Sequence, residues 1–214
     1  MKITVFGTGN VGGTLGTRWA RAGHTITFGV RDTSNSDVQK LIDEIGGSAC
    51  SKSLANAAED AEAVALCIPW DAAREVVASV GVLAGKTIID ATNPVVMTPD
   101  GLREGLVLGH TTSGAEQIAQ WAPDAHVVKA FNTTGWQNMA NPTYSGKPLT
   151  MMLCGDEQET KTTVADLARD VGFSPADVGP LKSARYLEAM AMLWIDMAVI
   201  QGAGPDFAFG IVKR

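Results

Sequence analysis

The sequence predicts an α/β fold in which helices cover both faces of a doubly wound, mostly parallel sheet. Short apolar or β-branched runs alternate with amphipathic segments along most of the 214 residues. The runs at residues 63–68 (AVALCI) and 87–91 (TIIDA) are almost continuously apolar. Continuous apolar runs are typical of strands that helices cover on both sides, so we expect these two at the centre of the sheet.

The first strand, helix and second strand follow one another directly. Residues 2–6 (KITVF) are a β-branched run, and apolar residues recur at a spacing of four within residues 10–22. Gly23 is a natural left-handed end for that helix, and residues 25–30 (TITFGV) then predict the second strand. Together they indicate one βαβ unit.

The same alternation continues along the chain. The further helices that we expect are 37–45, 54–59, 71–80, 115–121 and 157–170, and the further strands are 48–50, 63–68, 86–91, 127–131 and 149–154. Residues 94–110 are expected to be irregular. The apolar segment at about 182–200 is too short and too interrupted by charge for a membrane span, so we expect a C-terminal helical appendage that caps the core or forms a dimer interface. Residues 1–214 are expected to form one domain.

Composition excludes several classes of protein. Lysine and arginine (17) are outnumbered by aspartate and glutamate (23), and a net charge of −6 argues against a nucleic-acid partner. Neither a membrane span nor a leader-like start is recognisable, so a cytoplasmic location without membrane contact is expected. Cys50, Cys67 and Cys154 are odd in number and widely spaced, which predicts buried thiols rather than disulfides, and no metal site.

The strongest local signal is a GxGxxG motif between the first strand and its helix. Its residues are Gly7, Thr8, Gly9, Asn10, Val11 and Gly12. The first glycine permits a tight turn, the second lets the backbone approach a pyrophosphate, and the third allows close packing of the helix. The helix N-terminus adds amide donors and a positive dipole end. This context predicts a Rossmann-type dinucleotide site, with a glycine turn used only for packing as the alternative.

The end of the second strand favours NADP(H) over NAD(H). Many NAD enzymes place an acidic residue here, whereas this chain reads Val30, Arg31 and then Asp32. The Arg31 guanidinium can form a fork of hydrogen bonds to a 2′-phosphate, and Thr8 is a small hydroxyl that could face the same group. Asp32 is expected to turn toward solvent or a helix cap.

Two later strand ends fall on the edge of the sheet where open α/β folds bind ligands. The first carries Ile68, Pro69 and Trp70, and the second carries Asn93 before a proline. We therefore add these four residues to the predicted cofactor site. The alternatives stay open, because Trp70 could be a hydrophobic cap on the following helix and Asn93 a turn former.

A third strand end combines amide and hydroxyl groups with aromatic rings. Asn132, Thr133, Thr134 and Trp136 suit a flat heterocyclic substrate, although structural packing explains them equally well. No side chain is a persuasive general acid or base. His110, which precedes a Thr-Thr-Ser loop, is a further candidate site residue.

The motifs GTGNVGGTLG, GVRD, IPWD, DATNP, VKAFNTTGW and ARYLEAMAMLWI, in this order, resemble the NADP oxidoreductase family that includes deazaflavin-coenzyme-dependent NADP reductases. The resemblance implies that Thr8 to Val11 and Arg31 contact NADP. Those reductases commonly have a serine where this chain has Val30, and a lysine where it has Asn35, which implies weaker phosphate selectivity. The stretch AFNTTGW is more similar to the flavin-using cytosolic domain of six-transmembrane metalloreductases.

The sequence thus predicts an NADP(H)-dependent oxidoreductase that transfers a hydride between nicotinamide and a deazaflavin coenzyme or flavin (FMN or FAD). Such a reaction depends on alignment and the exclusion of water rather than on a protein acid or base. A homodimer is expected. The alternatives are an NADP(H)-sensing module without turnover and a small-substrate reductase completed by a dimer partner.

Overall fold

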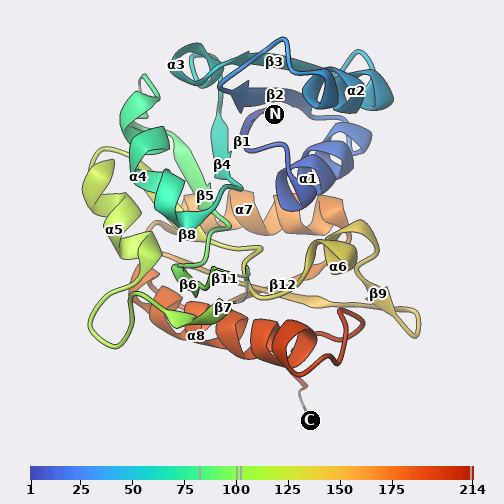
Figure 1. Ribbon diagram of the computed structural model, residues 1–214, viewed down its shortest axis with the longest axis vertical. Helices are drawn as coiled ribbons and strands as arrows, with labels where there is room; N and C mark the ends of the chain where they lie inside the picture. Colours follow the sequence, from blue (N-terminus) through green and yellow to red (C-terminus); the bar gives the residue numbers. More distant parts are fainter. Residues whose placement is uncertain (82, 100, 102, 213) are drawn as a thin grey trace.

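The computed structural model describes residues 1–81, 83–99, 101, 103–212 and 214. Its centre is an eight-stranded sheet in the order β12-β11-β8-β5-β4-β1-β2-β3 (Figure 1). The strands are β1 Lys2–Phe6, β2 Thr25–Val30, β3 Ala49–Ser53, β4 Ala63–Leu66, β5 Thr87–Asp90, β8 His126–Lys129, β11 Thr150–Gly155 and β12 Ser174–Asp177. The two near-continuous apolar runs, β4 and β5, lie at the middle, as their composition predicts.

Strand direction follows the connections. The six strands from β3 to β8 pair in parallel, because a helix-containing crossover joins most of the successive ones. β11 runs antiparallel to β8, and β12 pairs with β11 in parallel. The predicted Rossmann-type, mostly parallel sheet is confirmed.

Helices cover both faces of the sheet. One face packs against α1 Asn10–Arg21, α2 Ser36–Ile45, α6 Trp136–Ala140 and α7 Gln158–Val171. The other packs against α3 Leu54–Ala57, α4 Trp70–Ser79, α5 Gly114–Trp121 and α8 Ala184–Ile195. Short helical turns at Leu181–Ser183 and Asp196–Ile200 flank α8, so the predicted C-terminal helix is present.

The alternation of side chains along β1 separates the two cores. Ile3 and Val5 belong to the first core, whereas Phe6 belongs to the second. Thr4, on the second face, donates its buried hydroxyl to the carbonyl of Ala57 at 2.6 Å. The pattern leaves β1 buried on both sides, with its carboxyl end at the glycine turn.

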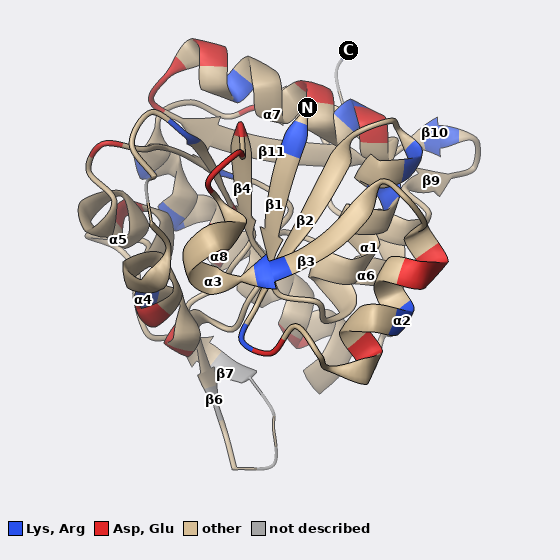
Figure 2. Cartoon of the chain, turned by 90° about the horizontal axis from the view of Figure 1, so that it is seen from above, with Lys and Arg blue, Asp and Glu red and all other residues tan. Residues whose placement is uncertain are grey.

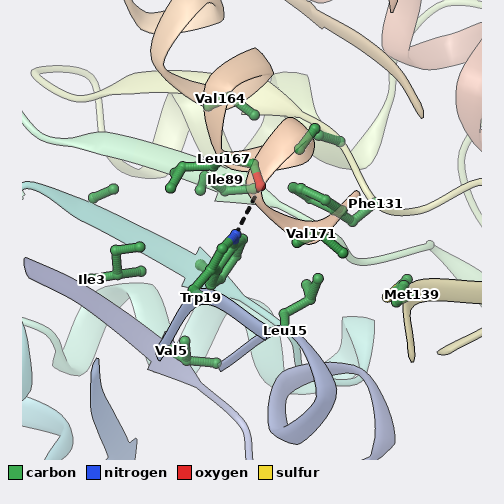
Figure 3. Close-up of a cluster of buried hydrophobic side chains, with 14 of the residues drawn as sticks. Ile3, Val5, Leu15, Trp19, Ile89, Phe131, Met139, Val164, Leu167 and Val171 are labelled. Atoms are coloured by element: carbon green, nitrogen blue, oxygen red, sulfur yellow. Dashed lines mark hydrogen bonds between the residues drawn. The ribbon is translucent and has the colours of Figure 1, made fainter. Parts of the chain in front are cut away.

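Trp19 anchors α1 in the first core. Its ring is fully buried, and its indole N–H donates to the Leu167 carbonyl of α7 at 3.0 Å (Figure 3). Phe131 meets the Trp19 ring edge-on, with centroids 5.7 Å apart. The helix that begins at the glycine turn is therefore held by apolar packing and one directional bond.

Several elements depart from the sequence expectations. The stretch expected to be irregular holds the antiparallel strands β6 Val95–Met97 and β7 Arg103–Leu106, and a second pair is formed by β9 Thr143–Tyr144 and β10 Lys147–Pro148. α6 spans five residues, which is too short to show helical periodicity. β12 (SPAD) contains a proline, which edge strands tolerate and sequence patterns penalise.

Charged residues gather on helices and connecting loops, while the central strands are largely free of them (Figure 2). The expectation of three buried thiols is wrong for Cys50, which is exposed on the edge strand β3. Cys154 is buried and Cys67 is half-buried, since both lie on interior strands or their ends.

Candidate functional site

The glycine turn after β1 contains two glycines that the fold itself requires. Gly7 has φ of +102°, and a Cβ there would lie 2.3 Å from the Cys67 carbonyl oxygen. A Cβ on Gly12 would lie 2.0 Å from the Gly7 carbonyl oxygen. Both close contacts bring α1 against the sheet, as the motif predicts.

Gly9 is different, because no atom of the described residues lies within 4 Å of the position of its Cβ. No internal packing therefore demands a glycine at this position. Its lack of a side chain leaves the backbone open at the place where the motif predicts a pyrophosphate. The residues present thus fit a dinucleotide.

The N-terminus of α1 is free to bind an anion. In the part of the chain that the structure describes, no side chain caps this helix, and its first turn has no acidic residue. The helix begins with the Gly13 amide bonded to the Gly9 carbonyl at 2.8 Å, so the preceding amides have no helical acceptor. Unpaired amides and the positive end of the helix dipole both favour a phosphate here.

A groove of about 400 Å³ runs from the glycine turn along α1 toward α6. Thr8, Gly9 and Asn10 line one end, and Trp136 lines it from the start of α6. Trp136 is 38% exposed, which is unusual for a ring of its size. The structure therefore brings one predicted substrate residue to the predicted cofactor turn.

At the end of β2 the two charged residues have different surroundings. Asp32 accepts the hydroxyl of Ser34 at 2.6 Å and its amide at 2.8 Å, and these bonds lower the pKa of Asp32. Asn35, rather than Asp32, caps α2. Arg31 is exposed and makes no hydrogen bond or ion pair with any described residue, whereas Val30 is buried. The guanidinium is therefore available to an anionic ligand.

The end of β4 lies against the glycine turn. A Cβ on Gly7 would meet Ile68 at 3.1 Å, and Pro69 stands at the N-cap of α4. Trp70 stacks on Trp121 of α5, with ring centroids 5.4 Å apart and planes 25° apart. This contact supports the packing interpretation of Trp70.

Asn93 and Asn132 join the ends of β5 and β8. The Asn93 amide donates to the backbone carbonyl of Asn132 at 3.0 Å, and the Asn132 amide donates to Asn93 Oδ1 at 3.1 Å. Thr133 is buried beside them, and Thr134 accepts a bond from Asn138 at 2.7 Å. The predicted contact residues at these two strand ends thus lie together.

A fully buried ion cluster lies at the last residues of β5 and β8, just before the two asparagines in the sequence, and the motifs did not predict it. Lys129 Nζ lies 2.9 Å from Asp90 Oδ2, 2.8 Å from Glu188 Oε1 and 2.7 Å from the carbonyl oxygen of Thr92. Burial lowers the pKa of Lys129, but the two carboxylates outweigh it and raise the pKa overall. A charge inside each of three apolar runs (TIIDA, HVVKAF, YLEAMAML) was the signal available in the sequence.

Glu188 also connects α8 with α5. Its carboxylate accepts the amides of Gly114 and Ala115 at 3.0 and 3.3 Å, at the first turn of α5. Ser113 caps the same helix and bonds to Glu116. The positive end of α5 therefore offsets part of the cluster's net negative charge.

His110 does not reach the glycine turn. It has φ of +55°, and its carbonyl accepts a bond from Arg185 at 3.2 Å. It lines a separate hollow of about 540 Å³ with Arg185 and Tyr186, and this hollow shares no lining residue with the groove along α1. The structure thus places His110 in a different hollow from the predicted pyrophosphate turn, and a site role for His110 stays a prediction.

Fold and glycine turn together define a Rossmann-type protein with a glycine turn of the dinucleotide-binding kind. A family model described as "NADP oxidoreductase coenzyme F420-dependent" matches residues 2–94. The F420-dependent NADP reductase of Methanothermobacter marburgensis is 29% identical over 219 aligned positions, which cover 95% of this chain and 96% of that protein. The resemblance predicted from the motifs is thereby confirmed.

Two further relatives cover different parts of the chain. The metalloreductase STEAP3 of Rattus norvegicus is 40% identical over 111 residues, which are 51% of this chain and only 21% of the metalloreductase. The crystal structure of a candidate F420-dependent NADP reductase from Arthrobacter sp. FB24 matches with a TM-score of 0.88, 28% identity and full coverage of both chains. No helix within the described residues combines the length and hydrophobicity of a membrane span.

Proposed function

We propose that this protein transfers a hydride between NADP(H) and a deazaflavin coenzyme, with FMN or FAD as the alternative acceptor. The observation that carries the proposal is the open glycine turn at an uncapped helix N-terminus, beside the exposed ring of Trp136. The first feature suits a dinucleotide, and the second suits a flat ring next to it.

Each part of the dinucleotide has a matching group in the chain. The backbone from Thr8 to Val11, which includes the open Gly9, would hold the pyrophosphate. Arg31 would bind the 2′-phosphate through its guanidinium, which has no partner among the described residues. Bound NADPH supplies the hydride. The chain's own contribution is to align the rings and to exclude water.

The second substrate is proposed to lie at the end of β8. Thr133 and Thr134 offer hydroxyl groups there, and Trp136 offers an aromatic face on the groove. A deazaflavin is favoured because the reductases that the chain matches over most of their length are named for coenzyme F420. The stretch AFNTTGW is the reason to retain a flavin as the alternative.

The test is anaerobic stopped-flow oxidation of NADPH with deazaflavin, FMN, FAD or riboflavin. The Arg31→Ala variant should raise KM for NADPH about 10- to 100-fold, as expected for the loss of a charge-assisted bond, and should leave the KM for NADH unchanged. Lys40→Ala, which removes an exposed cation from α2, is the matched control and should change neither.

Two results would contradict the proposal in different ways. Binding of NADPH without reduction of any acceptor would leave a sensing module in place of an enzyme. An equal effect of Arg31→Ala on NADPH and NADH would remove the assigned role of Arg31 in 2′-phosphate recognition.

We further propose that residues 1–214 form one domain and that two copies form a cytoplasmic homodimer through α8. Tyr186 is 72% exposed and Leu193 51% exposed on one side of this helix, and Val199 and Ile200 are exposed just beyond it. Exposed apolar side chains in series on a helix are typical of an interface. No nucleic acid or membrane partner is proposed.

A further inference from the structure

The ends of β5 and β8 carry two asparagines whose amide orientations are fixed by each other. Asn93 donates through Nδ2 to the backbone carbonyl of Asn132, which can only accept. Asn93 must therefore turn Oδ1 toward the side chain of Asn132. Asn132 in turn donates through its own Nδ2 to Asn93 Oδ1, at 3.1 Å.

This arrangement leaves Asn132 Oδ1 facing away from Asn93. The atom is buried and has no hydrogen-bond partner in the described part of the chain, and Asn132 as a whole is only 5% exposed. Turning the amide over would not help, because two oxygens would then face each other at Asn93. The orphaned atom is thus an acceptor, fixed by the residues around it.

The backbone just before Asn132 is held in an unfavourable conformation. Phe131 has φ of +62°, which is costly for a side chain of this size, and its amide bonds to the sulfur of Met151 at 3.1 Å. Strain and a buried unpaired acceptor on consecutive residues are each destabilising, and such features concentrate at ligand sites.

The place of this acceptor suits the nicotinamide end of a dinucleotide. The glycine turn follows β1, and β5 is the second strand from β1 in the order β8-β5-β4-β1. Two strand spacings of about 4.8 Å for Asn93, and three for Asn132, put the asparagine pair roughly 10–14 Å from the pyrophosphate cradle. The nicotinamide carries a carboxamide whose N–H groups are donors.

We infer that Asn132 Oδ1 accepts a hydrogen bond from the carboxamide N–H of bound NADP(H), and that Asn93 positions it. This rests on the proposed function, and it moves Asn132 from the second substrate to the cofactor. Since bulk water does not reach the acceptor, its missing bond is supplied only when a ligand brings a donor and the residues after Phe131 shift slightly to admit it.

The test compares NADP⁺ with its 3-acetylpyridine analogue, in which a methyl group replaces the NH₂ of the carboxamide. Calorimetry on the full chain should show that the wild-type protein prefers NADP⁺ on the order of tenfold. Asn132→Ala should bring this preference close to one. Asn56→Ala, an exposed asparagine on α3, is the matched control and should preserve the wild-type ratio.

Adenosine 2′,5′-bisphosphate, which lacks the nicotinamide, separates the two ways of failing. It should bind wild type and Asn132→Ala equally, which also shows that the variant is folded. If wild type bound this nucleotide and NADP⁺ but did not discriminate against the 3-acetylpyridine analogue, the inference would be overturned while the proposed function would stand. Suppose instead that Asn132→Ala kept the preference for NADP⁺ over its analogue but lost the preference among acceptor rings. Asn132 would then belong to the second substrate, and the inference would be overturned too. Failure of wild type to bind any of these nucleotides would overturn the proposed function with it.

Discussion

Replacement of Lys129 by methionine tests how much the buried ion cluster stabilises the fold. Among the described residues, Lys129 is the only cation paired with Asp90 and Glu188, both of which are fully buried, and the change removes it. Breaking a buried pair costs about 3–5 kcal/mol because charge is left unpaired in the interior. Each carboxylate keeps other donors, the Thr92 amide and hydroxyl for Asp90 and the α5 amides for Glu188, so we expect the lower end, about 3 kcal/mol.

The loss should depend on pH in a definite direction. Without the cation, two buried carboxylates carry charge that no cation offsets, and acid should relieve this cost. The deficit of the variant should therefore shrink as pH falls from 7.5 to 5. In the wild type the pKa of Lys129 is raised, so its contribution is complete below the ordinary lysine value of about 10.4 and is lost only as pH rises through the folded value.

Urea unfolding, followed by circular dichroism at several pH values, measures the loss of stability and its pH dependence. In a separate thermal melt at neutral pH, the melting temperature of the variant should fall by roughly 6–12 °C. Lys52→Met is the matched control, because Lys52 forms an exposed pair with Asp60 at 3.7 Å that should contribute at most about 1 kcal/mol. An equal loss in both variants, or a deficit that is the same at pH 5 and 7.5, would refute this view of the cluster.

Two further predictions concern the thiols and the surface of α8. An alkylating reagent at pH 8 should modify Cys50 in the folded protein and spare Cys67 and Cys154. Burial raises the pKa of both Cys67 and Cys154 to about 12, and the charge of Asp90 adds to the effect at Cys67. Mass spectrometry after brief labelling measures the modification, and equal reaction of all three thiols would contradict the prediction. Leu193→Glu should convert the proposed homodimer to a monomer in light scattering, since it puts a charge on the exposed apolar side of α8, and a monomeric wild type at tens of micromolar would disprove the dimer.

The cofactor half of the site is the part that sequence reasoning reaches best. The roles of Gly7 and Gly12 follow from local geometry, since each close contact lies within the first strand, turn and helix or at the neighbouring strand. Arg31 is predictable for the same reason, because the end of β2 is fixed by the length of the βαβ unit. The structure shows it exposed and unpaired among the described residues, while the binding role itself stays a prediction.

The other half of the site depends on contacts between distant segments. Asn93 and Asn132 are 39 residues apart, and nothing in either motif indicates that each fixes the amide of the other. The stacking of Trp70 on Trp121 depends in the same way on how α4 and α5 pack, which the order of elements alone does not determine. Tertiary packing thus decides between interpretations that the sequence leaves open.

The ion cluster and the asparagine pair act together to extend the pairing of β5 and β8 beyond the sheet. Where the strands end, the Ala130 amide bonds to the Asp90 carbonyl at 3.1 Å, Lys129 then bridges Asp90 and the Thr92 carbonyl, and the asparagines close the gap one step further on.

Such a series of bonds fixes the course of the two strand ends without any ligand, so that only a small shift after Phe131 would remain to be made on binding. The proposed hydride transfer uses no protein acid or base and would depend on alignment, which this edge would provide. Glu188 extends the same network to α8, so the helix proposed to form the dimer is joined by a buried ion pair to the strand end proposed to align the rings.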